Sequence, residues 1–141
     1  MLRDNMKLVG KLSIAVNDEI VQEVNNLVVT TGKNYVASRI KDTTAAAMSH
    51  MAIGTGSTSP AAGDTTLGTE TARVALTSTT VTNADVAYVS SFGAGTGTGA
   101  ITEAGLFNSS SAGTLFCRTT FSVVNKGADD SMTITWTVTV S

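Results

Sequence analysis

Ser131-Met-Thr-Ile-Thr-Trp-Thr-Val-Thr-Val140 is the stretch that decides the fold of this chain. Apolar residues occupy one parity of the stretch, and threonines occupy the other. A period of two is typical of a β-strand with one buried face. The second face carries Thr133, Thr135, Thr137 and Thr139 and no charge. Such a face suits contact with water or contact with a partner protein.

The composition is poor in charge. Of 141 residues, 42% are hydrophobic and 14% are charged, and the formal net charge is -2. This length predicts a single domain over residues 1–141. Charged side chains help to keep proteins apart in solution and are depleted in the cores of interfaces. The low charge therefore favours assembly over life as a monomer.

The distribution of charge and hydropathy argues against several partners. Lys and Arg are scattered and form no stripe, so we expect no nucleic-acid partner. No apolar run approaches the roughly 20 residues that cross a membrane, so we expect no membrane partner. The first eight residues lack the apolar core of a secretory signal, and we expect the protein to be made and assembled in the cytoplasm.

Short runs of β-forming residues, separated by turn residues, continue along the chain. We predict a first strand bulged at Gly10, followed by a hairpin turn at Asn17-Asp18. Helical spacing occurs only between residues 27 and 40, where Thr30 or Thr31 is a suitable cap, and predicts a short helix over 32–41. The predicted strands are 6–16, 20–24, 51–54, 73–81, 86–92, 101–107, 114–124 and 132–140. This pattern predicts an all-β, antiparallel, jelly-roll-like β-sandwich with one short helix near residues 32–41.

No group of residues indicates catalysis, so we expect no catalytic, cofactor-binding or metal-binding residue and no enzyme activity. Residues 93–99 are glycine-rich but lack the spacing of a phosphate-binding loop, and we expect a connection between strands. His50 is the only histidine, too little for a triad or a metal site, and we expect a structural role. We predict ion pairs at sheet borders for Glu70 with Arg73 and for Glu103 with Arg118, and a buried strand position for Cys117.

Three blocks of sequence together look familiar. They are Met51-Ala-Ile-Gly-Thr-Gly-Ser-Thr-Ser-Pro60 with Asp64, Leu67, Glu70 and Arg73; Ile101-Thr-Glu-Ala-Gly-Leu-Phe-Asn108; and Gly113-Thr-Leu-Phe-Cys-Arg118. The chain resembles small structural proteins of tailed bacteriophages, in particular capsid decoration (cement) proteins with a jelly-roll-like sandwich. Similar blocks also occur in phage tail-fibre and collar proteins. A tail, collar or baseplate-associated adaptor domain is therefore the alternative.

The resemblance implies a virion protein on the capsid surface, assembled in the cytoplasm of the host bacterium. Such a protein would bind the outside of the assembled shell and bridge subunits of the phage major capsid protein, and it would self-associate as a homodimer or homotrimer. It implies no cofactor. Residues 1–11 fit either an extended arm that orders on the shell or a frayed end. Our candidate partner-binding residues are Met1, Leu2, Arg3, Met6, Lys7, Thr133, Thr135 and Thr137.

Overall fold

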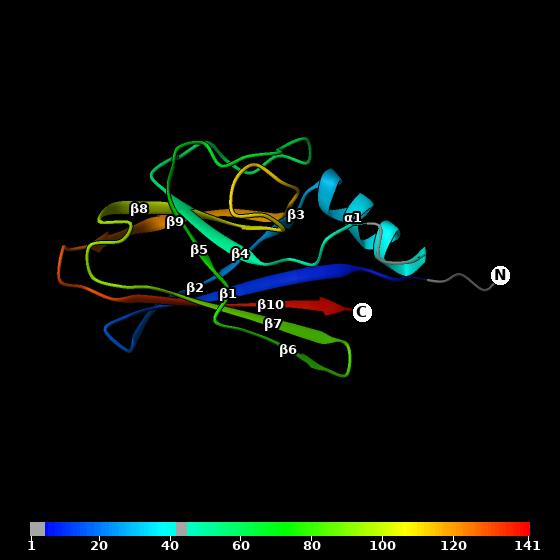
Figure 1. The fold of residues 1–141 in the computed structure, drawn as a ribbon, viewed down its shortest axis with the longest axis horizontal. Helices are drawn as coiled ribbons and strands as arrows, with labels where there is room; N and C mark the ends of the chain where they lie inside the picture. The colour runs from blue at the N-terminus through cyan, green and yellow to red at the C-terminus, as the bar shows by residue number, and fades with distance from the viewer. Residues whose placement is uncertain (1–4, 42–44) are drawn as a thin grey trace.

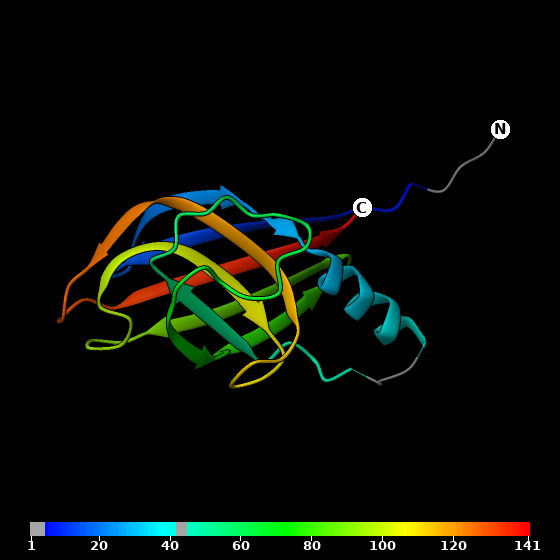
Figure 2. The ribbon, with the colours of Figure 1, turned by 90° about the horizontal axis from the view of Figure 1, so that it is seen from above.

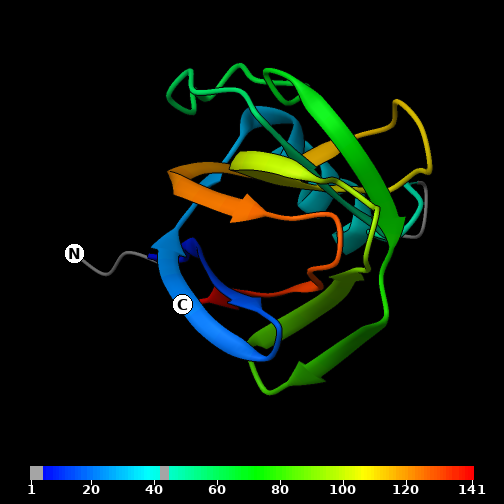
Figure 3. The ribbon, with the colours of Figure 1, turned by 90° about the vertical axis from the view of Figure 1, so that its left-hand side faces the viewer.

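The structure, a computed structural model, describes residues 5–41 and 45–141 as two antiparallel sheets packed face to face (Figures 1 and 3). Sheet A contains, in order, β2 (Glu19–Asn25), β1 (Leu8–Val16), β10 (Met132–Val140), β7 (Asp85–Phe92) and β6 (Ser78–Thr82). Sheet B contains β3 (Leu27–Val28), β9 (Leu115–Lys126), β8 (Gly99–Phe107), β4 (His50–Gly54) and β5 (Glu70–Ala75). The helix α1 (Thr30–Lys41) lies at one end of the sandwich (Figure 2). The predicted all-β sandwich with one short helix is confirmed.

The terminal strand β10 is the central strand of sheet A. Its residues Met132, Ile134 and Trp136 are fully buried against sheet B, and the threonines between them are half-buried on the outer face. The Trp136 indole Nε1 donates a hydrogen bond to Asn26 Oδ1 at 3.1 Å, which satisfies its only polar group. Cys117 is also fully buried, and burial raises the pKa of its thiol. The predictions for Trp136 and Cys117 are confirmed.

Residues 55–69 cover the outer face of sheet B, where they lie across β8 and β9 (Figure 2). Beneath them Glu103 is fully buried, and its carboxylate accepts hydrogen bonds of 2.7 Å from the backbone N–H groups of Gly56, Gly68 and Thr69. The pairing of β8 with β9 is irregular between Ile101 and Glu103, and Glu103 faces residues 55–69 whereas Ile101 faces the core. The loop is therefore attached to the sheet by a side chain of the sheet.

Arg118 on β9 completes this attachment. Its guanidinium donates to Glu103 Oε1 at 3.0 Å, to Asp64 Oδ2 at 2.9 Å and to the Thr58 carbonyl at 2.9 Å. The pair was predicted at a sheet border, but Glu103 is 0% and Arg118 2% exposed, inside the molecule. The prediction of its position was wrong because the loop over sheet B converts an outer sheet face into an interior. A small apolar cluster lies under the same cover and consists of Val29, Ala52, Leu67, Phe107 and Leu115.

The glycines of the first sequence block make room for this carboxylate. A Cβ atom on Gly56 would overlap Glu103 Oε2, and one on Gly54 would overlap the Thr69 carbonyl oxygen. Glycine is required at these positions because the backbone approaches so closely. The Gly-Thr-Gly spacing is thus structural.

The second predicted ion pair is confirmed. Arg73 donates to both carboxylate oxygens of Glu70, at 2.9 and 2.7 Å. Its guanidinium lies 3.7 Å from the centroid of the Phe107 ring and also donates to the carbonyls of Ser109 and Ala112. Arg73 therefore ties the edge of sheet B to the loop that follows β8.

Three local predictions need correction. The predicted strand 73–81 is two strands in different sheets, because Leu76 N donates to Ser49 O beside sheet B whereas Thr77 N donates to Val89 O in sheet A. The bulge predicted at Gly10 lies elsewhere: β1 pairs with β10 without interruption, and the irregularity separates Ile14 from Ala15 in the pairing with β2. The helix begins at Thr30, two residues earlier than predicted.

An extended arm or a frayed end was expected over residues 1–11, but the last four of these residues form part of a strand. Residues 8–11 belong to β1, and Lys7 exchanges two backbone hydrogen bonds with Ser141, at 2.7 and 2.9 Å. Residues 1–4 lie outside the described residues.

The buried carboxylate predicts how stability depends on pH. Burial alone would raise the pKa of Glu103, but the three backbone donors and Arg118 outweigh burial and hold the pKa below its usual range. The stabilisation by the ionised carboxylate is complete above the pKa of the unfolded chain, about 4.3. It is lost as the pH falls through the lower pKa of the folded protein.

We expect Glu103→Gln to lower the free energy of unfolding by about 3 kcal/mol at pH 7, because it removes the fully buried charge partner of Arg118 and leaves the partly exposed Asp64 carboxylate beside it. Urea unfolding at a series of pH values measures this loss, which should shrink below about pH 4 as the wild type is protonated. Glu70→Gln, at a partly exposed pair, is the matched control and should cost about 1 kcal/mol or less. Equal stability of Glu103→Gln and wild type at pH 7 would contradict this account.

Candidate functional site

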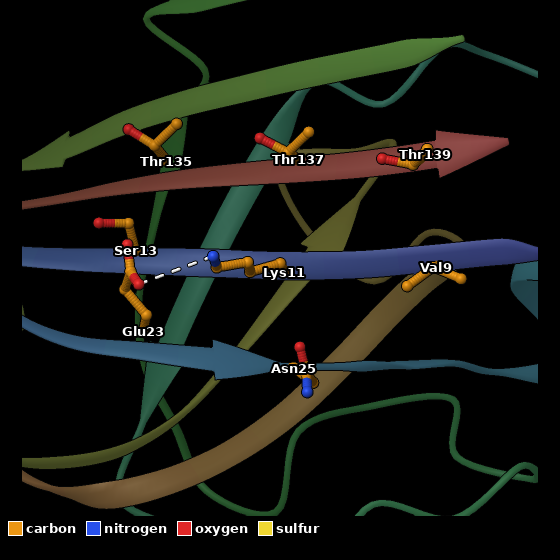
Figure 4. Close-up of a pocket in the computed structure, with 8 residues that line it drawn as sticks. All are labelled: Val9, Lys11, Ser13, Glu23, Asn25, Thr135, Thr137 and Thr139. Carbon is orange, nitrogen blue, oxygen red and sulfur yellow. Dashed lines mark ion pairs between the residues drawn. The ribbon is translucent and has the colours of Figure 1, made fainter. Parts of the chain in front are cut away.

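The outer face of sheet A is the candidate interaction surface. β10 lies between β1 and β7, so its threonines form the middle column of this face. Thr135, Thr137 and Thr139 pair with Ser13, Lys11 and Val9 of β1. Figure 4 shows these side chains projecting from the sheet on the same side. On the other flank, Thr133, Thr135, Thr137 and Thr139 pair with Ser91, Val89, Ala87 and Asp85 of β7.

A shallow groove of about 440 Å³ runs along this face. β10 and β1 supply most of its lining, and β2 closes one side with Glu23 and Asn25. The side chains at its rim, Val9, Lys11, Glu23 and Asn25, are exposed. The lining consists of Val9, Lys11, Ser13, Glu23, Asn25, Thr135, Thr137 and Thr139.

Three of the ionisable side chains on these strands, Lys11, Glu23 and Asp85, have polar partners. Lys11 Nζ lies 3.6 Å from Glu23 Oε2, and both side chains are more than half exposed. Asp85 accepts a hydrogen bond of 2.7 Å from the Thr139 hydroxyl. The remaining outward residues paired with β10 are small or hydroxyl-bearing, apart from Val9 and Val89. The threonine column itself contains no ionisable side chain, so a partner that covers this column would desolvate no charge of β10, which lowers the cost of burial.

The candidate residues from the N-terminus lie beside this face. Met6 and Lys7 line an apolar cleft of about 760 Å³ between the start of β1 and α1. Val9 lines both the cleft and the threonine groove, so the two depressions adjoin along β1. Met6 is 77% exposed. Met1, Leu2 and Arg3 lie outside the described residues.

The sequence alone did not single out the residues that β1 and β2 contribute. Lys11, Ser13, Glu23 and Asn25 join the groove because the first hairpin pairs with the last strand, from Leu8 opposite Val140 to Val16 opposite Met132. The alternation of Val9, Lys11, Ser13 and Ala15 in the sequence indicates their shared face. The sequence pattern does not show which strand pairs with them, because their partner β10 lies at the other end of the chain.

His50, Glu70 and Glu103 belong to sheet B, apart from this face. His50 in β4 forms a hydrogen bond of 2.8 Å between Nδ1 and the Ser49 hydroxyl, and Glu70 and Glu103 are bound by the arginines described above. Residues 93–98 connect β7 with β8, as predicted, and Gly99 begins β8. Over residues 5–41 and 45–141, no cluster of three or more His, Cys, Asp and Glu is placed to bind a metal ion. Within the same residues, α1 is too short and too polar to span a bilayer.

Comparisons with protein-family models, with curated proteins and with solved structures gave no match.

Proposed function

We propose that the protein is a structural component of a tailed-phage virion that binds the outside of the assembled capsid. It stabilises the shell by bridging neighbouring subunits of the major capsid protein. The observation that carries this proposal is the asymmetry of the sandwich. Sheet B is covered by residues 55–69, whereas the outer face of sheet A keeps exposed and half-buried side chains, and its Lys11 is paired with Glu23.

The chemistry of the open face suits a protein partner. Interface cores are depleted in charged residues, and the threonine column of β10 carries none. Rigid, half-buried hydroxyl side chains on a sheet lose little conformational freedom when they are covered. Lys11 is paired with Glu23, so this face offers no positive stripe for nucleic acid or for an anionic membrane.

A shell protein gains from repetition. A standard interface buries about 1,600 Å² in total, and many symmetric copies multiply a modest gain per contact. The Met6 cleft adjoins the threonine face at Val9, so one copy offers two adjoining contact regions. Two such regions are what a bridge between capsid subunits requires.

The copy number in purified virions tests the location. A decoration protein is expected in numbers comparable to those of the major capsid protein, which quantitative mass spectrometry of virions measures. A few copies per particle would contradict the proposal and would select the alternative, a tail, collar or baseplate-associated adaptor.

The threonine face is tested by Thr135→Lys combined with Thr137→Lys. Both side chains point away from the core, so the melting temperature should change little. Binding to empty capsids should weaken by more than about tenfold, because unpaired charges are costly to bury in an interface. Ser110→Lys combined with Ser111→Lys adds the same charge to the exposed loop after β8 and serves as the control. Equal binding by both double variants would remove the threonines from the interface.

A further inference from the structure

Within residues 5–41 and 45–141 the sandwich has four edge strands, and they differ in how they are protected. The edges are β2 and β6 in sheet A, and β3 and β5 in sheet B. An edge strand presents unpaired backbone N–H and C=O groups that can pair with another chain. Proteins block such edges with charges, bulges, short strands or covering segments.

Three of the edges carry such protection. β2 contains Glu19 and Glu23 and has an irregular pairing with β1. β5 carries the Glu70–Arg73 ion pair and a bulge opposite β4. β3 has only two residues, and α1 follows one residue after its end.

The edge strand β6 has none of these features. Its sequence Ser78-Thr-Thr-Val-Thr82 contains no charge and no proline, and all five residues are exposed. It pairs with β7 without a register shift. Val81 is 69% exposed, an unusual position for a valine. Figure 1 shows β6 at the lower margin of the molecule.

The register identifies the backbone groups that β6 presents. Val140 N donates to Ala84 O, so Ala84, just before β7, directs its backbone groups towards β10. Because this direction alternates along a strand, the even-numbered residues of β7 also bond to β10, and the odd-numbered residues bond to β6. Ser78, Thr80 and Thr82 stand opposite odd-numbered residues. The backbone groups of Thr79 and Val81 therefore point outwards.

We propose that β6 pairs antiparallel with β6 of a second copy of this chain, about a twofold axis at Thr80. In this register Thr79 stands opposite Val81 of the second copy, and all their outward N–H and C=O groups are used. Ser78 stands opposite Thr82 of the second copy, and Thr80 stands opposite itself. The two five-stranded A sheets become one continuous sheet.

Self-pairing suits the charge and the length of β6. An antiparallel pair of β6 strands brings no like charges together, because Ser78–Thr82 contains no ionisable side chain. The five-residue contact falls short of the roughly 1,600 Å² that a standard stable interface buries, so the association is weak in dilute solution. This inference does not rest on the proposed capsid function, because it concerns the purified protein alone.

Disulfide trapping tests the register. Thr80 and its copy form a non-hydrogen-bonded pair with Cα atoms about 4.5 Å apart, within the range that a disulfide spans. Thr80→Cys is expected to give a dimer of twice the 14.4 kDa chain under mild oxidation, resolved on a non-reducing gel. Cys117 is fully buried and does not compete.

Ser78→Cys and Thr82→Cys are the matched controls on the same strand and face. Each alone should react at least about tenfold more slowly than Thr80→Cys, because its copy lies too far away for a disulfide. A mixture of the two, one of them tagged, should form the heterodimer. Thr79→Pro in the Thr80→Cys background removes an outward donor and should suppress the dimer. Equal rates for the three cysteines, or no dimer from Thr80→Cys, would overturn the proposal.

Discussion

Glu103 and Arg118 are buried together on the outer face of sheet B, and Arg118 Nη2 lies 3.0 Å from Glu103 Oε1. Removing two charges from water costs several kcal/mol for each ion, so such a pair persists only where further hydrogen bonds satisfy both groups. Here three backbone N–H groups donate hydrogen bonds to the Glu103 carboxylate, and the Arg118 guanidinium also donates to Asp64 and to the Thr58 carbonyl. All of these additional partners come from residues 55–69, so the ion pair and the loop require each other.

This mutual dependence divides the molecule into a closed side and an open side. The loop covers sheet B and adds the small apolar cluster around Leu67. On sheet A, Val9, Lys11, Glu23 and Asn25 along the threonine groove are exposed, and so is the edge strand β6. The proposed contacts with the shell and with a second copy use the face and the edge of sheet A. Neither contact needs any part of sheet B to move.

Local patterns in the sequence predicted much of the fold. The alternation of β10 fixed its buried face, and Asn17-Asp18 forms the predicted hairpin turn with φ angles of 50° and 69°, which suit these residue types. The ion pair of Glu70 with Arg73 could also be predicted from the local sequence, because the two residues lie three positions apart in one strand.

Features that depend on distant segments were harder to predict. Residues 73–81 look continuous in sequence, but neighbouring residues Leu76 and Thr77 bond to different sheets. Gly10 resembles a bulge residue, yet its function is to leave space for the Asn26 side chain that binds Trp136. The threonine face was visible in the sequence, whereas its neighbours on β1 and β2 follow from pairing between the two ends of the chain.

Amide hydrogen exchange measures the central constraint most directly. The account predicts that the N–H groups of Gly56, Gly68 and Thr69 exchange as slowly as those of the buried strand β8, because they open only when Glu103 is released. Exchange as fast as that of Ala94 and Gly95, in the exposed turn before β8, would show that residues 55–69 are not held by the carboxylate and would contradict the account.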